Sequence, residues 1–246
     1  MRPGLAALLG ALGAALASIP VYAHFRRAPR DRDAERKGSH LLLGLGDFLV
    51  HWFLWAIGPL ERGLLRIGVS PDQLNAAGLL LGLASGLLLG MGHLEAGGWA
   101  IAFSGVSDIL DGRLARAQGV ANAYGKFIDS TLDRFVETFA FLGLVTYYRH
   151  QPVAAFVAAA GLSGSLLVSY AQARGETANV SGAGGMMQRA ERLVLVALGC
   201  LSDPSLSAAL GRPEGTVLFW ILALVAIGSL ATAIYRTVWI ARRLRQ

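Results

Sequence analysis

Long apolar runs alternate with short polar segments along this chain and predict a bundle of membrane-spanning helices. Residues 73–94, 151–173 and 216–235 contain no Asp, Glu, Lys or Arg, and about 20 apolar residues suffice for a helix to cross a bilayer. Three more helices are expected, from Trp99 to about residue 112, from about residue 127 to Tyr148, and over 193–202. They predict a six-helix transmembrane core whose helices satisfy their own backbone hydrogen bonds in lipid. The main connections are expected at 95–98, 113–126, 174–192 and 203–215.

An additional helix is expected ahead of this core. Residues 3–23 contain no Asp, Glu, Lys or Arg, and a basic cluster follows at 24–37. They predict an N-terminal transmembrane helix whose first residue lies outside the cell. Cleavage of a signal peptide after Val21-Tyr22-Ala23 is the alternative, but it would leave the basic cluster outside, against the positive-inside rule. We divide the chain into an N-terminal helix with a basic linker, 1–40, and a membrane domain, 41–246.

The segment 41–66 interrupts its apolar residues with charged ones and has a row of aromatic side chains at Trp52, Phe53 and Trp55. This pattern favours an amphipathic helix that lies at the membrane interface, with a short spanning helix as the alternative. Ser70 then precedes a proline, which predicts a helix that begins there with Ser70 as its cap.

Basic residues gather in alternate connections of the predicted bundle. The segments 24–37, 113–126, 174–192 and 236–245 each hold three or more Lys or Arg, whereas the loops between them hold at most one. Since Lys and Arg collect on cytoplasmic loops, both ends of the six-helix core are expected in the cytoplasm. The protein is thus expected to be integral to the cytoplasmic membrane.

Composition agrees with a membrane protein. Hydrophobic residues make up 54% of the 246 residues and charged residues 15%, whereas about a quarter of a soluble domain is charged. The mean hydropathy is +0.51. These values exclude a disordered chain and an ordinary soluble domain. The net charge of +6 is interpreted as a marker of topology rather than of a nucleic-acid partner, and the single Cys200 excludes a disulfide or a cysteine metal site.

Four carboxylates fall within the predicted core, where ionisable groups mark functional sites. Asp108 and Asp111 are three residues apart and Asp129 and Asp133 are four apart, so the members of each pair share one helix face. The first pair lies at the cytoplasmic end of one predicted helix and the second at the start of the next. We therefore expect the two pairs to face each other across a cleft that opens to the cytoplasm.

Such a cluster predicts a divalent metal site. Four neighbouring negative charges repel one another unless a cation lies among them. Oxygen ligands without His or Cys favour Mg²⁺ or Mn²⁺ over Zn²⁺, and Mg²⁺ held by carboxylates is typical where the substrate brings phosphates. One or two ions are expected. The alternative is a loop in which the carboxylates form salt bridges with Arg113, Arg116 and Arg134.

Small residues accompany the carboxylates. Gly112, Ala115 and Gly125 are expected to let two helix backbones approach closely while leaving room for a flat nucleotide. Arg116 suits a phosphate or a carboxylate partner.

Residues 108–133 read D-I-L-D-G-R-L-A-R-(8)-G-K-F-I-D-S-T-L-D. This string resembles the signature of the CDP-alcohol phosphotransferase family, D-x2-D-G-x2-A-R-x8-G-x3-D-x3-D, and matches it at every specified position. A six-helix core preceded by an interfacial helix also resembles that family. The resemblance covers roughly residues 41–246 and leaves the N-terminal helix outside.

The resemblance implies transfer of a phosphatidyl group from CDP-diacylglycerol to an alcohol at the cytoplasmic face, with release of CMP. It implies that two divalent metals, Mg²⁺ or Mn²⁺, grip the pyrophosphate, and a homodimer would fit the family. The implied metal ligands are Asp108, Asp111, Asp129 and Asp133, with Asp133 also activating the acceptor hydroxyl. The implied CDP-lipid pocket consists of Gly112, Ala115, Arg116 and Gly125.

Two further stretches concern the acceptor. Residues 169–176 (S-Y-A-Q-A-R-G-E) and 188–193 (Q-R-A-E-R-L) resemble the S-Y-x-R-A-R-A-E and E-R-x-E-R-L elements of phosphatidylinositol-phosphate synthases. The resemblance implies inositol phosphate as the acceptor, with its phosphate held by Arg174, Arg189 and Arg192. Gln172 and Gln188 depart from the pattern, so glycerol 3-phosphate or another polar alcohol stays open, as does simple anchoring by cytoplasmic arginines.

A transporter that uses the Asp cluster as its ion site is the alternative from a different class. It is disfavoured because transporter sites lie near the bilayer midplane, on broken helices in inverted repeats, whereas these carboxylates are expected near one surface.

Overall fold

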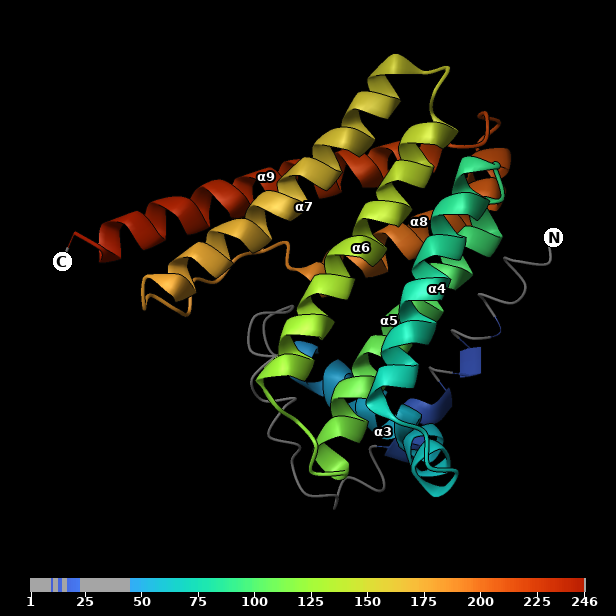
Figure 1. Ribbon diagram of the computed structural model, residues 1–246. Coiled ribbons are helices and arrows are strands. Elements are labelled where there is room, and N and C mark those ends of the chain that lie inside the picture. Colours follow the sequence, from blue (N-terminus) through green and yellow to red (C-terminus); the bar gives the residue numbers. More distant parts are fainter. Residues whose placement is uncertain (1–9, 11–12, 15–16, 23–44, 246) are drawn as a thin grey trace.

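The computed structural model describes residues 10, 13–14, 17–22 and 45–245, and this part of the chain is helical throughout apart from short connections (Figure 1). The predicted all-α class is confirmed. The helices are α3 (Leu45–Arg66), α4 (Pro71–Gly90), α5 (Leu94–Ala117), α6 (Ala123–Tyr147), α7 (Pro152–Thr177), α8 (Arg189–Ala209) and α9 (Thr216–Arg243).

Most of the expected N-terminal helix and its basic linker lie outside the described residues, so the boundary at residue 40 stays a prediction. Residues 17–22 are helical and contact α3. The indole nitrogen of Trp52 donates to the Ser18 hydroxyl at 2.8 Å, and the rings of Tyr22 and Trp55 lie 5.6 Å apart.

The start of α4 is the one that the sequence predicts. The Ser70 hydroxyl accepts from the backbone N–H of Gln73 at 3.2 Å, and the Gln73 side chain accepts from the backbone N–H of Ser70 at 2.9 Å. This reciprocal pair is a capping box, with Pro71 in the first turn.

Three expected connections are shorter in the structure. Gly97 and Gly98 lie inside α5 rather than in a turn, and a Cβ on Gly98 would lie 3.0 Å from the Cβ of Cys200 in α8. The connection expected at 113–126 shrinks to 118–122, because α5 continues to Ala117 and the Asn122 side chain caps α6. Helix α8 likewise continues through Pro204. Gly97, Gly98 and Pro204 lie inside helices because packing against neighbouring helices decides where these helices end.

Helix α4 packs against both α5 and α6, whereas few residues of α5 and α6 contact each other. The crossing of α4 and α6 is close because it consists of glycines. A Cβ on Gly82 would lie 2.7 Å from Val136 Cγ2, a Cβ on Gly86 would collide with the Phe139 carbonyl, and a Cβ on Gly143 would collide with the Gly86 carbonyl. Small residues of this kind let helix backbones approach in membranes.

The second half of the bundle is built around α8, which packs against α5 and α9. Helix α7 lies along α9, and Figure 1 shows the two projecting together beyond the group formed by α4, α5 and α6. The α6–α7 and α8–α9 turns meet at one end of the bundle, where the Tyr148 hydroxyl donates to the Gly215 carbonyl at 2.6 Å. The α5–α6 connection lies at the other end, where the Gln118 side chain donates to the Val69 carbonyl at 2.8 Å.

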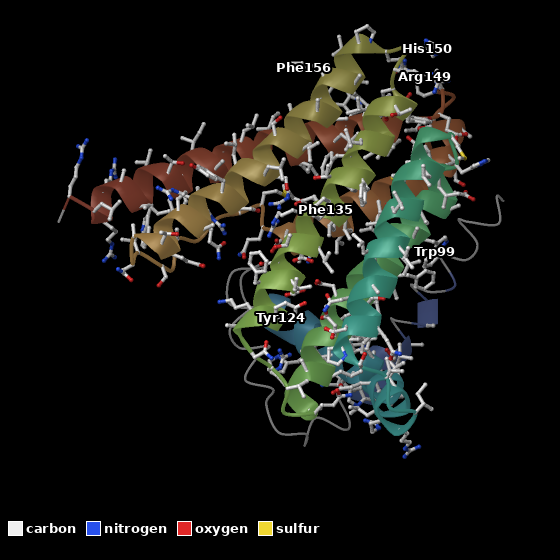
Figure 2. All side chains as sticks on the ribbon, in the orientation of Figure 1. Trp99, Tyr124, Phe135, Arg149, His150 and Phe156 are labelled. Carbon is white, nitrogen blue, oxygen red and sulfur yellow. The ribbon has the colours of Figure 1, made fainter. Side chains whose placement is uncertain are left out.

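Four helices of the described residues, α4, α7, α8 and α9, are long and apolar enough to cross a membrane. Helices α5 and α6 carry the charged residues of the signature and are not among them. Large apolar side chains such as Phe135 on α6 and Phe156 on α7 are exposed and project away from the bundle (Figure 2), as lipid contact requires.

Candidate active site

The carboxylates of α5 and α6 converge at the end of the bundle that holds the α5–α6 connection. Asp108, Asp129 and Asp133 are half-buried, and each offers a carboxylate oxygen that lies within 4.8 Å of the others. Asp111 lies outside this group of three. Asp111 is 3% exposed, and its carboxylate accepts from the backbone N–H of Gly112. The negative charges of Asp108 and Asp129 are close enough to repel that of Asp111.

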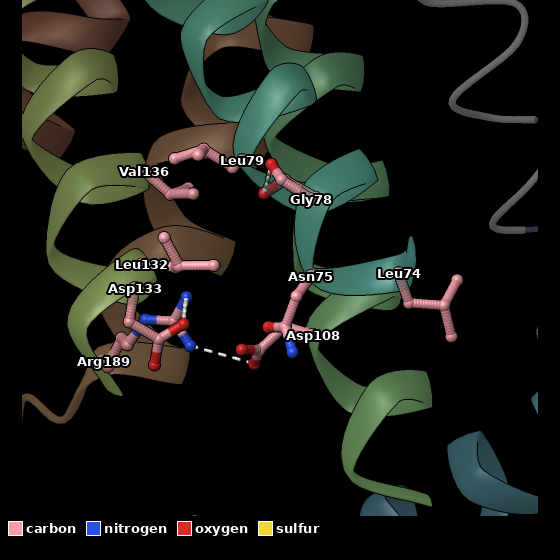
Figure 3. Close-up of a pocket in the computed structure, with 10 residues that line it drawn as sticks. Leu74, Asn75, Gly78, Leu79, Asp108, Leu132, Asp133, Val136 and Arg189 are labelled. Atoms are coloured by element: carbon pink, nitrogen blue, oxygen red, sulfur yellow. Dashed lines mark hydrogen bonds and ion pairs between the residues drawn. The ribbon is translucent and has the colours of Figure 1, made fainter. Parts of the chain in front are cut away.

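Arg189, the first residue of α8, lies between the two carboxylate-bearing helices. Its guanidinium donates to Asp108 at 2.9 Å and forms an ion pair with Asp133 at 2.5 Å (Figure 3). The alternative of a salt-bridged loop predicted that the carboxylates pair with Arg113, Arg116 and Arg134. Two of these arginines form ion pairs with other residues. Arg113 contacts Glu61 of α3 at 2.6 Å, and Arg134 contacts Glu137 at 3.4 Å.

A pocket opens beside this ion pair. Asp133 and Arg189 line one side of it, and Asp108 lies across from them beside Asn75 (Figure 3). The start of α4 also contributes Leu74, Gly78 and Leu79 to the lining. The sequence singled out the start of α4 only for its helix cap. The structure adds Asn75, which lies five residues after the cap residue Ser70 and shares the pocket with Asp108.

The small residues of the signature leave space rather than bring helices together. A Cβ on Gly112 would meet only the Arg116 guanidinium, at 3.4 Å, and one on Gly125 only the Asn122 side chain, at 3.6 Å, among the residues that the structure describes. The expectation that Gly112 and Gly125 bring two helix backbones together is therefore wrong. They leave space beside the carboxylates, and the exposed Arg116 side chain partly covers Gly112.

The three arginines expected at the acceptor lie in different surroundings. Arg189 lies in the carboxylate cluster, and Arg174 is exposed in the last turn of α7. Arg192 is fully buried and paired with Glu137 of α6, so its guanidinium does not face a surface that an acceptor could reach.

A second, polar pocket lies next to the start of α8. It is lined by Gln172 and Glu176 of α7, the loop 180–184, Gln188, and Arg236 of α9. The Arg236 guanidinium donates to the Gln172 side chain at 2.7 Å and to the Gly184 carbonyl at 3.1 Å. Sequence reasoning treated Arg236 only as a topology marker, because nothing along the chain links it to residue 172.

The donor set of the carboxylate cluster fits a divalent cation. Its ligand atoms are carboxylate oxygens from two helices, close enough to share one ion, without His or Cys among the three clustered residues. Hard cations such as Mg²⁺ and Mn²⁺ prefer this set. The apolar helices and the oxygen-ligand cluster with a small pocket beside it together define a membrane protein with a candidate divalent-metal site.

The chain belongs to the CDP-alcohol phosphatidyltransferase family, whose model matches residues 69–241. It is therefore an integral membrane enzyme of phospholipid synthesis. The family assignment confirms the predicted reaction class over the transporter alternative.

The relatives include phosphatidylinositol phosphate synthases. The chain is 34% identical over 188 residues to that of Mycobacterium bovis, covering 74% of this chain and 84% of the relative. It is 36% identical over 199 residues to that of Streptomyces avermitilis, covering 78% and 80%.

Solved structures of the phosphatidylinositol phosphate synthase from Mycobacterium tuberculosis have a similar fold. A crystal structure with CDP-DAG bound has a TM-score of 0.65 and 31% identity, covering 74% of this chain and 92% of that one. Another, in complex with manganese and citrate, has a TM-score of 0.65 and 33% identity, covering 74% and 88%. The manganese in the structure of that relative agrees with the prediction of a divalent-metal site in this chain.

Proposed function

We propose that this protein transfers the phosphatidyl group of CDP-diacylglycerol to an inositol phosphate, releasing CMP and forming a phosphatidylinositol phosphate. The observation that carries the proposal is the convergence of the signature carboxylates of α5 and α6 around Arg189. The similarity to phosphatidylinositol phosphate synthases supports this choice of acceptor. Glycerol 3-phosphate is the second candidate, since Gln172 and Gln188 stand where the resembling elements have charged residues.

The four signature carboxylates would hold two divalent ions, either Mg²⁺ or Mn²⁺. These carboxylates are Asp108, Asp111, Asp129 and Asp133. When bound, such ions stabilise the charge that develops on the attacking and leaving oxygens during phosphoryl displacement. Gly112, Ala115, Arg116 and Gly125 would form the CDP-lipid pocket. The position of the exposed Arg116 guanidinium next to Gly112 supports this assignment.

Asp133 is the proposed catalytic base. Its carboxylate accepts the proton of the acceptor hydroxyl, whose oxygen forms a bond to the phosphorus that carries diacylglycerol. The bond from that phosphorus to the oxygen of CMP breaks, and CMP leaves with the electron pair. A small pocket lies beside Asp133 and Arg189, and the acceptor hydroxyl is proposed to approach the base from this side.

The proposed acceptor-binding residues are Arg189 and Arg174. Arg189 is close enough to Asp133 to hold an acceptor phosphate beside the base, and guanidinium groups bind phosphates in a bidentate manner. Arg174 is exposed in the last turn of α7, the helix whose Gln172 lines the polar pocket. That pocket reaches Gln188, next to Arg189, and supports a route for a polar acceptor.

The proposed setting is the cytoplasmic membrane, with six spans formed by α4 to α9, α3 at the interface and the site facing the cytoplasm. The carboxylate end of the bundle carries Arg113, Arg116 and Lys126, in agreement with the positive-inside rule. We also propose a homodimer, as fits the family, which crosslinking in native membranes tests.

An acceptor panel tests the function. Purified full-length protein with CDP-diacylglycerol and Mn²⁺ or Mg²⁺ is expected to release CMP fastest with inositol phosphate. Faster release with glycerol 3-phosphate would reassign the acceptor, and no release with any alcohol would refute the reaction. Arg174→Gln is expected to raise the KM for the acceptor and leave that for CDP-diacylglycerol unchanged. Arg242→Gln, an equally exposed change at the end of α9, is the control; equal effects of the two variants would indicate anchoring.

A further inference from the structure

Glu137 and Arg192 form a fully buried ion pair between α6 and α8. Both side chains have no exposed area, and the guanidinium of Arg192 contacts both carboxylate oxygens of Glu137, with Nε at 2.8 Å and Nη2 at 3.3 Å. The pair lies outside the signature. Its arginine, Arg192, is one of the three that the family resemblance assigns to binding of the acceptor phosphate.

This pair lies one helical turn from the site on both helices. Glu137 follows Asp133 by four residues on α6, and Arg192 follows Arg189 by three on α8, so each shares a helix face with its neighbour. The two helices are therefore joined by two successive rungs. The outer rung is Asp133 with Arg189, at 2.5 Å, and the inner rung is Glu137 with Arg192.

The inner rung also holds the start of α8. Arg192 donates to the Met187 carbonyl at 2.9 Å, and the Met187 backbone N–H donates to the Thr232 hydroxyl of α9 at 3.2 Å. One guanidinium thus ties α6 to the residues that precede Arg189, and through them to α9. Rotation or sliding of α8 against α6 would break both contacts between Arg192 and Glu137 together.

We infer that Glu137 and Arg192 are positioning residues, which hold Arg189 and Asp133 in register for the reaction. This inference rests on the proposed roles of Asp133 and Arg189. Stability alone does not explain such a pair, because a buried ion pair is often replaced by apolar residues without loss of stability. A bidentate guanidinium–carboxylate contact fixes distance and orientation, as apolar packing does not.

The test uses the full-length enzyme and removes the pair in two ways. In the double variant Glu137→Gln with Arg192→Met neither member of the fully buried pair is left charged without its partner, and the amide oxygen introduced at position 137 can still accept from the half-buried Arg134. Its thermal midpoint is therefore expected near that of the wild type. Arg192→Lys keeps the charge but loses the planar fork. Both are expected to weaken Mn²⁺ binding, measured by electron paramagnetic resonance without substrates, and to lower kcat, each by roughly 10- to 100-fold. The KM for CDP-diacylglycerol is expected to stay within about twofold of the wild-type value.

Asp203→Asn is the matched control, because Asp203 is a fully buried carboxylate at the far end of α8. It is expected to lower the thermal midpoint and leave Mn²⁺ binding and kcat unchanged. Wild-type Mn²⁺ binding and kcat in the double variant or in Arg192→Lys would overturn the inference and leave the pair a packing element. If the wild type releases no CMP with any acceptor, the proposed function fails, while the Mn²⁺ titration still decides whether the pair positions the carboxylates.

Discussion

Asp203 is expected to be a main determinant of stability at the end of the bundle opposite the site. Helix α9 begins at Thr216, and the residue at its N-cap position, Gly215, has no side chain that could cap it. Asp203 of α8 provides the cap instead. Its carboxylate accepts from the backbone N–H groups of Gly215 at 2.6 Å and Leu218 at 2.9 Å, and from the Ser207 hydroxyl at 2.9 Å.

The magnitude follows from these contacts. Asp203→Asn replaces one acceptor oxygen by a donor NH₂, so that one of the two N–H groups at the start of α9 loses its partner in a site without solvent. A hydrogen bond to a charged group contributes about 1.5–3 kcal/mol, and a buried unsatisfied donor costs about 1–3 kcal/mol. We expect a loss of about 3 kcal/mol in the free energy of unfolding, or roughly 6–12 °C in the thermal midpoint for a chain of this size.

The assay is thermal unfolding in detergent together with CMP release. Asp203 is 14 residues from Arg189 along α8, or about 21 Å at 1.5 Å per residue, so kcat and KM are expected to stay at wild-type values below the midpoint. Ser202→Ala is the control, because the Ser202 hydroxyl donates to the Leu198 carbonyl of its own helix and its loss is expected to change the midpoint little. A midpoint of Asp203→Asn equal to that of the control would refute the capping role.

Three further outcomes are expected. Asp133→Asn should lower CMP release by about 100-fold or more with an unchanged thermal midpoint, as for loss of a general base; an active variant would exclude Asp133 from that role. Chelation of divalent ions should abolish CMP release and added Mn²⁺ or Mg²⁺ restore it, whereas activity that persists in excess chelator would argue against metal use. Gly86→Ala should destabilise the bundle by about 1–3 kcal/mol, because its methyl would overlap the Phe139 carbonyl. Gly63→Ala, where a Cβ meets nothing within 4 Å, should be neutral or stabilising, and equal midpoints for the two glycine variants would contradict close packing at Gly86.

Spacing within one helix predicts which side chains share a face, and much of the site could be predicted on this basis. The interval of four residues placed Asp129 and Asp133 on one face, which meets Asp108 in the structure, whereas Asp111, three residues after Asp108, lies outside that group. The capping box at Ser70 is equally local, since its two hydrogen bonds lie within four residues. Apolar length identified the helices, but not where they stop, because Pro204 and Gly98 continue helices whose ends are decided by packing.

Spacing within one helix could not predict which side chains of another helix lie opposite a given face. Arg189 and Arg192 share a face and were assigned one role, yet the first lies among the Asp residues and the second is buried against Glu137. The difference comes from residues of α6 that are distant in sequence, since Glu137 lies 55 residues before Arg192. The same holds for Asp203, which caps a helix that begins 13 residues later through a turn whose shape the sequence does not specify.

The arrangement of α4, α5 and α6 explains why the carboxylates face a pocket rather than each other's helix backbones. Both α5 and α6 pack on α4 and make few contacts with one another. On one side the Ser104 hydroxyl of α5 donates to the Gly78 carbonyl at 2.9 Å, and on the other the backbone of α6 lies against Gly86. Because α4 holds both helices closely, the gap between them is set by a rigid third element. Helices that are positioned in this way keep acidic side chains at a fixed separation without the contact between α5 and α6 that would close the site.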